Sequence, residues 1–160
     1  MQIRFTKNTG KQNVIKYIRD NGTETWMYCD DFFIRHDLSH YALEKILGYK
    51  TAFNGMLNAG MDIRDFEDKE KRAKLSVTAE AWYAENLANL FLIEIAQGHF
   101  DDFNQVQQAG FVSFNQQYPP VVLPDEKIKE VRDHLSELLA QWKALPSGET
   151  LELTFHALRF

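Results

Sequence analysis

The chain has 160 residues, a length that predicts one domain spanning residues 1–160. Apolar residues make up 44% and aromatic residues 13%, which excludes an intrinsically disordered chain and predicts a substantial hydrophobic core. The net charge of −5 and the lack of a strongly basic segment argue against a nucleic-acid partner. No apolar run approaches the ~20 residues that cross a bilayer, so no membrane partner is predicted.

The single cysteine, Cys29, cannot form an intramolecular disulfide, which is typical of a protein from a reducing compartment. The N-terminal residues contain no apolar segment of the kind found in a signal peptide. We therefore expect a soluble, cytoplasmic protein.

Two parts of the sequence predict β-strands. Ile3 and Phe5 alternate with polar neighbours, which is the period-two pattern of a half-buried strand. Further β-rich runs surround Asn21-Gly22, a pair typical of a tight hairpin turn, so the first 30 residues predict a three-stranded meander. Residues 151–155 alternate in the same way. We expect this last strand to join the meander, because an isolated strand would leave its backbone groups unpaired.

Start and stop signals predict a cluster of helices in the remaining chain. Asp30 and Asp31 can cap the first helix, and Ser76 or Thr78 can cap the longest one. The helices are expected at residues 32–47, 51–58, from 76 or 78 to 97, 100–109 and 125–145, with an exposed charged segment over 62–74 and a loop over 110–123.

These elements together predict an α+β fold. An antiparallel sheet of about four strands, the N-terminal meander plus the C-terminal strand, would pack against a cluster of about four or five helices. The helix ending near Gln97 is apolar on more than one face, so we expect it to lie centrally.

One group of polar residues on the first predicted helix could bind a metal ion. His36 and His40 are one turn apart and share a helix face, so both imidazoles can reach a single divalent ion. Glu44 follows one turn later, and Asp37 lies beside the same face, where it could orient a histidine. Imidazole combined with carboxylate suits zinc or iron. The sequence therefore predicts a metal site in which His36 and His40 bind the ion, with Glu44 as one candidate for the carboxylate ligand.

A ligand from a second element is needed to complete such a site. Glu94 interrupts an apolar run of the longest helix, where an unpaired carboxylate is costly to bury. Glu85 on the same helix is the other candidate, and both are preferred over His99. If the site is catalytic, metal-bound water would be the nucleophile of a hydrolysis.

Two other interpretations stay open. The polar residues around His36 could form a solvent-exposed helix face, or a buried His–Asp pair with a structural role only. Alternatively, the many aromatic residues could line a ligand pocket without a metal. The protein would then be a non-enzymatic module that binds a small molecule or a protein partner, or forms a homodimer. The sequence does not decide whether the protein is an enzyme.

Two motifs resemble those of known families, but neither is complete enough to assign the chain to a family. The spacing His-Asp-x-x-His resembles the ubiquinone-biosynthesis zinc proteins, but Ala52 stands where that family carries a glutamate. The His36-Asp37 doublet resembles the HD-type phosphohydrolases, which need another histidine upstream of the doublet. No histidine precedes His36 in this chain.

Overall fold

The computed structural model describes residues 1–74, 78–114 and 118–156. Its four strands form one antiparallel sheet in the order β3-β2-β1-β4. The strands are β1 (Gln2–Thr6), β2 (Asn13–Ile18), β3 (Glu24–Cys29) and β4 (Thr150–Thr154). The predicted meander is confirmed, and so is the place of the C-terminal strand, because Ile3 of β1 pairs with Tyr17 on one side and Leu153 on the other.

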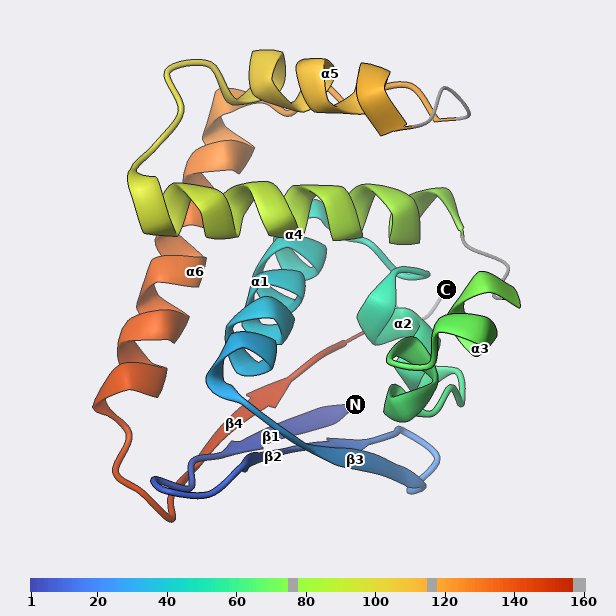
Figure 1. Ribbon diagram of the computed structural model, residues 1–160, viewed down its shortest axis with the longest axis vertical. Helices are drawn as coiled ribbons and strands as arrows, with labels where there is room; N and C mark the ends of the chain where they lie inside the picture. The colour runs from blue at the N-terminus through green and yellow to red at the C-terminus, as the bar shows by residue number, and fades with distance from the viewer. Residues whose placement is uncertain (75–77, 115–117, 157–160) are drawn as a thin grey trace.

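Within the described residues, six α-helices and one 3₁₀ turn lie on one side of this sheet (Figure 1), which confirms the α+β class. The charged segment over 62–74 adds short, mostly exposed helical turns to the helices that the sequence predicts. The helices are α1 (Asp31–Leu47), α2 (Phe53–Asn58), η1 (Ile63–Phe66, the 3₁₀ turn), α3 (Lys69–Lys74), α4 (Ala79–Gln97), α5 (Phe103–Phe114) and α6 (Asp125–Ala144).

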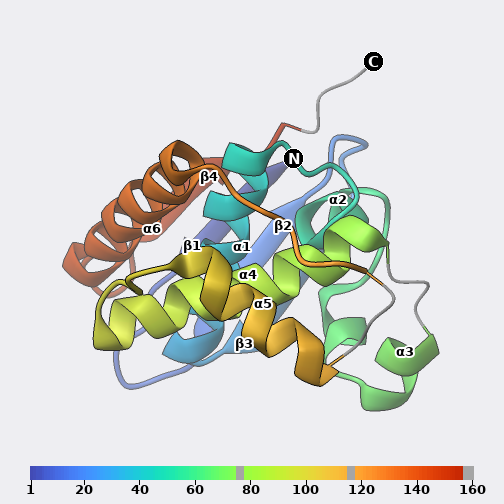
Figure 2. The same ribbon diagram turned by 90° about the horizontal axis from the view of Figure 1, so that it is seen from above.

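Helix α1 lies at the centre of the helical layer, between the sheet and α4, with α6 along its other side (Figures 1 and 2). Helix α5 forms a further layer over α4. Because α1 is covered from several directions, every residue from Asp37 to Glu44 is buried, polar ones included. The interpretation of the polar residues around His36 as a solvent-exposed face is therefore wrong.

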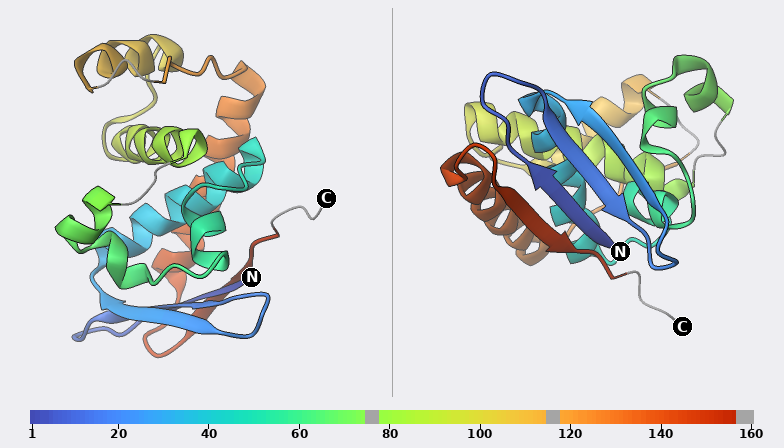
Figure 3. Two further views of the ribbon diagram at one scale, coloured as in Figure 1. Left: turned by 90° about the vertical axis from the view of Figure 1, so that its right-hand side faces the viewer. Right: turned by 90° about the horizontal axis from the view of Figure 1, so that it is seen from below.

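The two faces of the sheet differ in what covers them. Side chains that alternate along the strands, such as Phe5 and Ile15, point to the helices and are fully buried. The view from below shows the strands in front of the helices (Figure 3), so this second face is open over the described residues. Trp26 and Tyr28 lie on it as an exposed edge-to-face pair, as their alternation in the sequence predicts.

The segment from 100 to 123 departs from the sequence prediction. The predicted helix over 100–109 begins instead at Phe103, after Asp102, whose carboxylate accepts a hydrogen bond of 3.0 Å from the backbone N–H of Gln105. The helix then continues to Phe114, so the loop predicted over 110–123 is wrong for its first five residues. Gly110 is accommodated inside the helix, since glycine weakens a helix without breaking it. Residues 115–117 lie outside the described part.

Of the two residues predicted as the possible N-cap of α4, the structure describes Thr78. The hydroxyl of Thr78 accepts a hydrogen bond of 3.0 Å from the N–H of Ala81, so Thr78 is the N-cap. The alternative cap, Ser76, lies outside the described residues. No helix in the described ranges is both long enough and apolar enough to cross a membrane.

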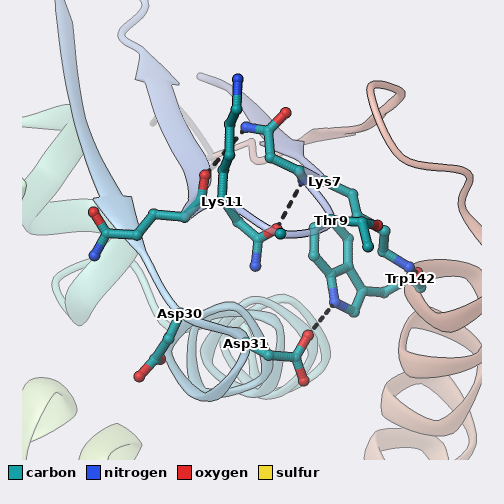
Figure 4. A pocket seen from close by; sticks show the side chains of 10 residues that line it. Lys7, Thr9, Lys11, Asp30, Asp31 and Trp142 are labelled. Carbon is teal, nitrogen blue, oxygen red and sulfur yellow. Dashed lines mark hydrogen bonds between the residues drawn. The ribbon is translucent and has the colours of Figure 1, made fainter.

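A cavity of about 600 Å³ lies beside the β1–β2 turn (Figure 4). The indole N–H of Trp142 donates to Asp31 at 2.8 Å there, which ties α6 to the first turn of α1. The ammonium group of Lys7 donates to the carbonyl oxygens of Trp142 and Lys143 near the C-terminal end of α6. These contacts hold α6 against the sheet, and we assign no functional site to this cavity.

Candidate metal centre

Three side chains from two helices converge at one point of the fold. Nε2 of His40 lies 2.9 Å from one carboxylate oxygen of Glu85, and Nε2 of His36 lies 3.4 Å from the other. The two histidines come from successive turns of α1, and Glu85 comes from α4, which packs against α1. The ligand atoms of the three residues all lie within 4.8 Å of one another, so this group could hold a metal ion.

The other nitrogen of each imidazole faces a second carboxylate. Nδ1 of His40 lies 3.0 Å from Glu44, and Nδ1 of His36 lies 3.4 Å from Asp37. A carboxylate on Nδ1 fixes the ring orientation of a metal-binding histidine and makes its other nitrogen a better ligand. Both Nε2 atoms are therefore directed to the same carboxylate, that of Glu85.

Asp37 and Glu44 are themselves held by residues from other elements. Glu44 is fully buried, and its second oxygen accepts hydrogen bonds from the backbone N–H of Asn54 at 2.9 Å and from its side-chain amide at 3.1 Å. The hydroxyl of Tyr17, from β2, donates to Asp37 at 2.9 Å. The sequence does not predict the supporting roles of Asn54 and Tyr17, because only the packing of α2 and β2 against α1 brings these residues here.

The pKa values of the cluster reflect this close pairing. Burial lowers the pKa of His36, but its hydrogen bonds to Asp37 and Glu85 outweigh that effect and raise the pKa to about 10. The pKa of His40 is also raised, since the contacts with Glu44 and Glu85 exceed the opposing effect of burial. Burial favours a higher pKa for Glu85, yet the two histidines hold it well below its usual range.

The phenol of Tyr17, which contacts Asp37, also has a shifted pKa. Burial raises the pKa of its phenol well above the usual value, and the neighbouring charge of Asp37 raises it further. The phenol therefore keeps its proton, so it remains a hydrogen-bond donor to the carboxylate that faces His36.

Of the two candidates on α4, the structure brings Glu85 to the histidines and leaves Glu94 elsewhere. Glu94 is nine residues further along the helix, which corresponds to about 13.5 Å. Its carboxylate accepts hydrogen bonds from the guanidinium of Arg132 at 2.9 and 2.5 Å, and one from the N–H of Phe100 at 2.7 Å. The carboxylate is therefore buried as half of an ion pair. His99 is exposed just beyond the end of α4.

The group of His36, His40 and Glu85 lies in the wall of a cavity of about 800 Å³. Apolar and aromatic side chains form most of the remaining wall. His40 has only 2% of its side chain exposed, whereas Glu85 has 55%. His40 is thus anchored in the core and His36 is partly exposed, while the carboxylate they share borders open space where a further molecule could approach.

No family model matches this chain, and no curated protein or solved structure matches it either. We therefore infer function from the geometry of the cluster and the cavity.

Proposed function

We propose that this protein binds a divalent metal ion, zinc or iron, through Nε2 of His36, Nε2 of His40 and the carboxylate of Glu85. One observation carries the proposal: both Nε2 atoms converge on one carboxylate while both Nδ1 atoms face buried carboxylates. Two histidines and one carboxylate form the protein ligand set of many catalytic zinc sites and of non-haem iron sites. Glu44 and Asp37 would then orient the histidines and would not bind the ion.

The number of carboxylates also favours a cation. A structural histidine–carboxylate pair needs one carboxylate for each ring, but each imidazole here faces two. Three carboxylates, those of Asp37, Glu44 and Glu85, therefore surround two rings. Even with both rings charged, the cluster would carry one surplus negative charge in a partly buried setting, and a divalent cation is attracted by such a surplus.

Hydrolysis is the chemistry that we propose for this ion. Three protein ligands leave a coordination position for water, which would lie on the side of the half-exposed Glu85 and the cavity. A bound zinc ion lowers the pKa of such a water to about 7, so it becomes a nucleophile at neutral pH. A substrate in the cavity would be within reach of it.

The test is the metal content of protein purified without a histidine tag or chelator, measured by mass spectrometry and followed by zinc titration. We expect about one ion per chain, as for a single site with three protein ligands. The double variant His36→Ala/His40→Ala should lose the ion. Because His40 is buried and its loss could disturb folding, Glu85→Gln is the second variant: it keeps the shape of a half-exposed side chain and should also lose the ion.

A matched control comes from His99, an exposed histidine away from the cluster. His99→Ala should bind zinc as the parent protein does. Absence of metal from the parent and from zinc-treated protein, or equal binding by Glu85→Gln, would refute the proposal.

A second function is favoured by the open face of the sheet. The exposed aromatic pair of Trp26 and Tyr28 could serve a non-enzymatic interaction module that binds a protein partner or a second copy of the chain. Sedimentation velocity tests the homodimer: Trp26→Ser/Tyr28→Ser should convert a dimer into a monomer. A parent protein that sediments as a monomer at high concentration would count against it.

A further inference from the structure

Aromatic rings run along the cavity wall on both sides of the two histidines. The ring of Phe32 stacks on His36 with centroids 6.3 Å apart, and the ring of Phe53 lies 5.0 Å from that of His40. Phe66 continues the row at 5.0 Å from Phe53. The proposed metal ligands are therefore part of an aromatic wall, and a molecule bound to the ion would also contact these rings.

The size and composition of the cavity favour an apolar molecule with a ring. Its volume of about 800 Å³ lies within the range of about 300–1,000 Å³ that is typical of small-molecule sites. Flat aromatic faces pack best against another ring. Met27 and Met56 also line the cavity, and methionine side chains adapt their shape to a ligand.

The cavity has an apolar approach from solvent. Phe32 is 62% exposed although it lines the cavity, and its neighbour Phe33 is also partly exposed. Large apolar side chains exposed at the edge of a concave site are typical of a binding site and are costly to leave in water without one. An apolar ligand that covers these rings would remove this cost.

The charges of the cluster select the polar group of the ligand. A divalent ion together with the carboxylates of Asp37, Glu44 and Glu85 has a net charge of about −1. Glu67 and Arg72 also line the cavity, and their opposite charges leave this sum unchanged. By Coulomb's law this net charge disfavours an anionic ligand. A cationic group would be repelled by the ion at the open coordination position. A neutral carbonyl oxygen meets neither obstacle, and it is a group that a metal ion polarises.

We propose that the cavity binds a neutral ester or amide that carries an aromatic group, with the carbonyl oxygen at the metal ion and the ring against Phe32 and Phe53. This inference rests on the proposed metal site. In the hydrolysis, the water oxygen bonds to the carbonyl carbon, and the bond from that carbon to the alcohol oxygen or amine nitrogen breaks. One water proton goes to this leaving group, and the product is a carboxylic acid. Once ionised, this acid is repelled by the net charge of the cluster, which favours its release.

Methionine methyl groups provide the test, because the chain has four methionines and two of them line the cavity. Zinc-loaded protein with ¹³C-methyl methionine is titrated with phenylacetamide, phenylacetate and phenethylamine, which share a ring and differ in charge. We expect phenylacetamide to shift the signals of Met27 and Met56 and to leave those of Met1 and Met61 unchanged. It should bind at least about tenfold more tightly than the other two compounds, and more tightly to zinc-loaded than to zinc-free protein.

A cavity variant and its control complete the experiment. Ala81 is buried in the cavity wall, so Ala81→Leu should fill part of the space and weaken phenylacetamide binding at least about tenfold. Ala140 is exposed on α6, and Ala140→Leu should leave binding unchanged. Zinc content, measured separately, should stay the same in both variants.

The outcomes separate the two proposals. If the protein takes up zinc but phenylacetamide does not shift Met27 and Met56, or the charged compounds bind equally well, the substrate inference fails and the metal site stands. If no zinc is taken up, the proposed function fails, and the substrate inference fails with it because the carbonyl has no ion to bind.

Discussion

At the scale of single residues, substitution of Glu44 tests whether this residue orients His40 or binds the ion itself. Its carboxylate faces Nδ1 of His40, the ring nitrogen that points away from Glu85. Glu44→Gln keeps the shape of the side chain but removes the charge that orients the imidazole. We expect the variant to bind about one zinc ion with affinity about 10–100-fold lower, the usual cost of losing such a partner. Competition with a chromophoric chelator measures this, and complete loss of the ion would make Glu44 a ligand instead.

Gly55 shows how one small residue positions the cluster. A Cβ atom at this position would lie 1.8 Å from the carbonyl oxygen of Lys50, too close for any side chain. Gly55→Ala must therefore move the start of α2, where Asn54 donates two hydrogen bonds to Glu44. We expect the free energy of unfolding to fall by about 2–3 kcal/mol, as in other overpacked sites.

Gly110, inside α5, is the matched control for that substitution. A Cβ atom built there meets no atom of the described structure within 4 Å. Gly110→Ala should leave stability unchanged or raise it by about 0.5–1 kcal/mol, because alanine is the better helix former. Urea denaturation measures both variants, and an equal effect of the two would contradict the steric explanation.

At the scale of elements, the ion pair between Glu94 and Arg132 joins α4 to α6. Glu94 is buried with Arg132 as its cationic partner, so Arg132→Met leaves a buried carboxylate uncompensated. We expect a loss of about 3–5 kcal/mol in the free energy of unfolding. The double variant Glu94→Gln/Arg132→Met should recover much of this loss, because it removes the charge as well. Zinc affinity should not change in either variant, and a parallel loss of zinc binding would contradict the separation of the two sites.

The sequence predicts most elements well where the local signal is strong. Alternation in β1 to β4, the Asn21-Gly22 turn and the caps of α1 and α4 all act through neighbouring residues, so the strands and these two helices are confirmed. The charged segment over 62–74 and the extension of α5 beyond Gly110 depend on weak helical preferences. Helix α3 buries none of its residues, so packing does not explain it, and the sequence pattern alone leaves both segments undecided between helix and loop.

The candidate site illustrates the same limit. The i, i+4 spacing is enough to place His36 and His40 on one face, and the structure bears out that placement. The choice between Glu85 and Glu94 depends on which turn of α4 crosses α1 and on where Arg132 lies, and both are tertiary facts. The burial of the polar residues around His36 also follows from α4 and α6, which lie far along the chain.

At the scale of the whole molecule, the cluster joins four elements of the fold by polar contacts, beside others such as the hydrogen bond from the Ser39 hydroxyl of α1 to the carbonyl oxygen of Ala88 in α4. His36 and His40 belong to α1, Glu85 to α4, and the carboxylates behind the histidines are held by Asn54 of α2 and Tyr17 of β2. In the unfolded chain these groups are far apart in sequence, so the complete ligand set exists only in the folded state. An ion bound here must therefore stabilise the fold as a whole.

This coupling predicts a change in global stability. At a zinc concentration of about 100 times the dissociation constant, the free energy of unfolding should rise by about 2.7 kcal/mol. For a chain of this size, that corresponds to an increase of about 5–11 °C in the melting temperature. Scanning calorimetry measures the shift, which a chelator should reverse. Glu85→Gln should show no shift, and His99→Ala should show the full one. An equal shift in Glu85→Gln would mean that zinc binds elsewhere on the protein.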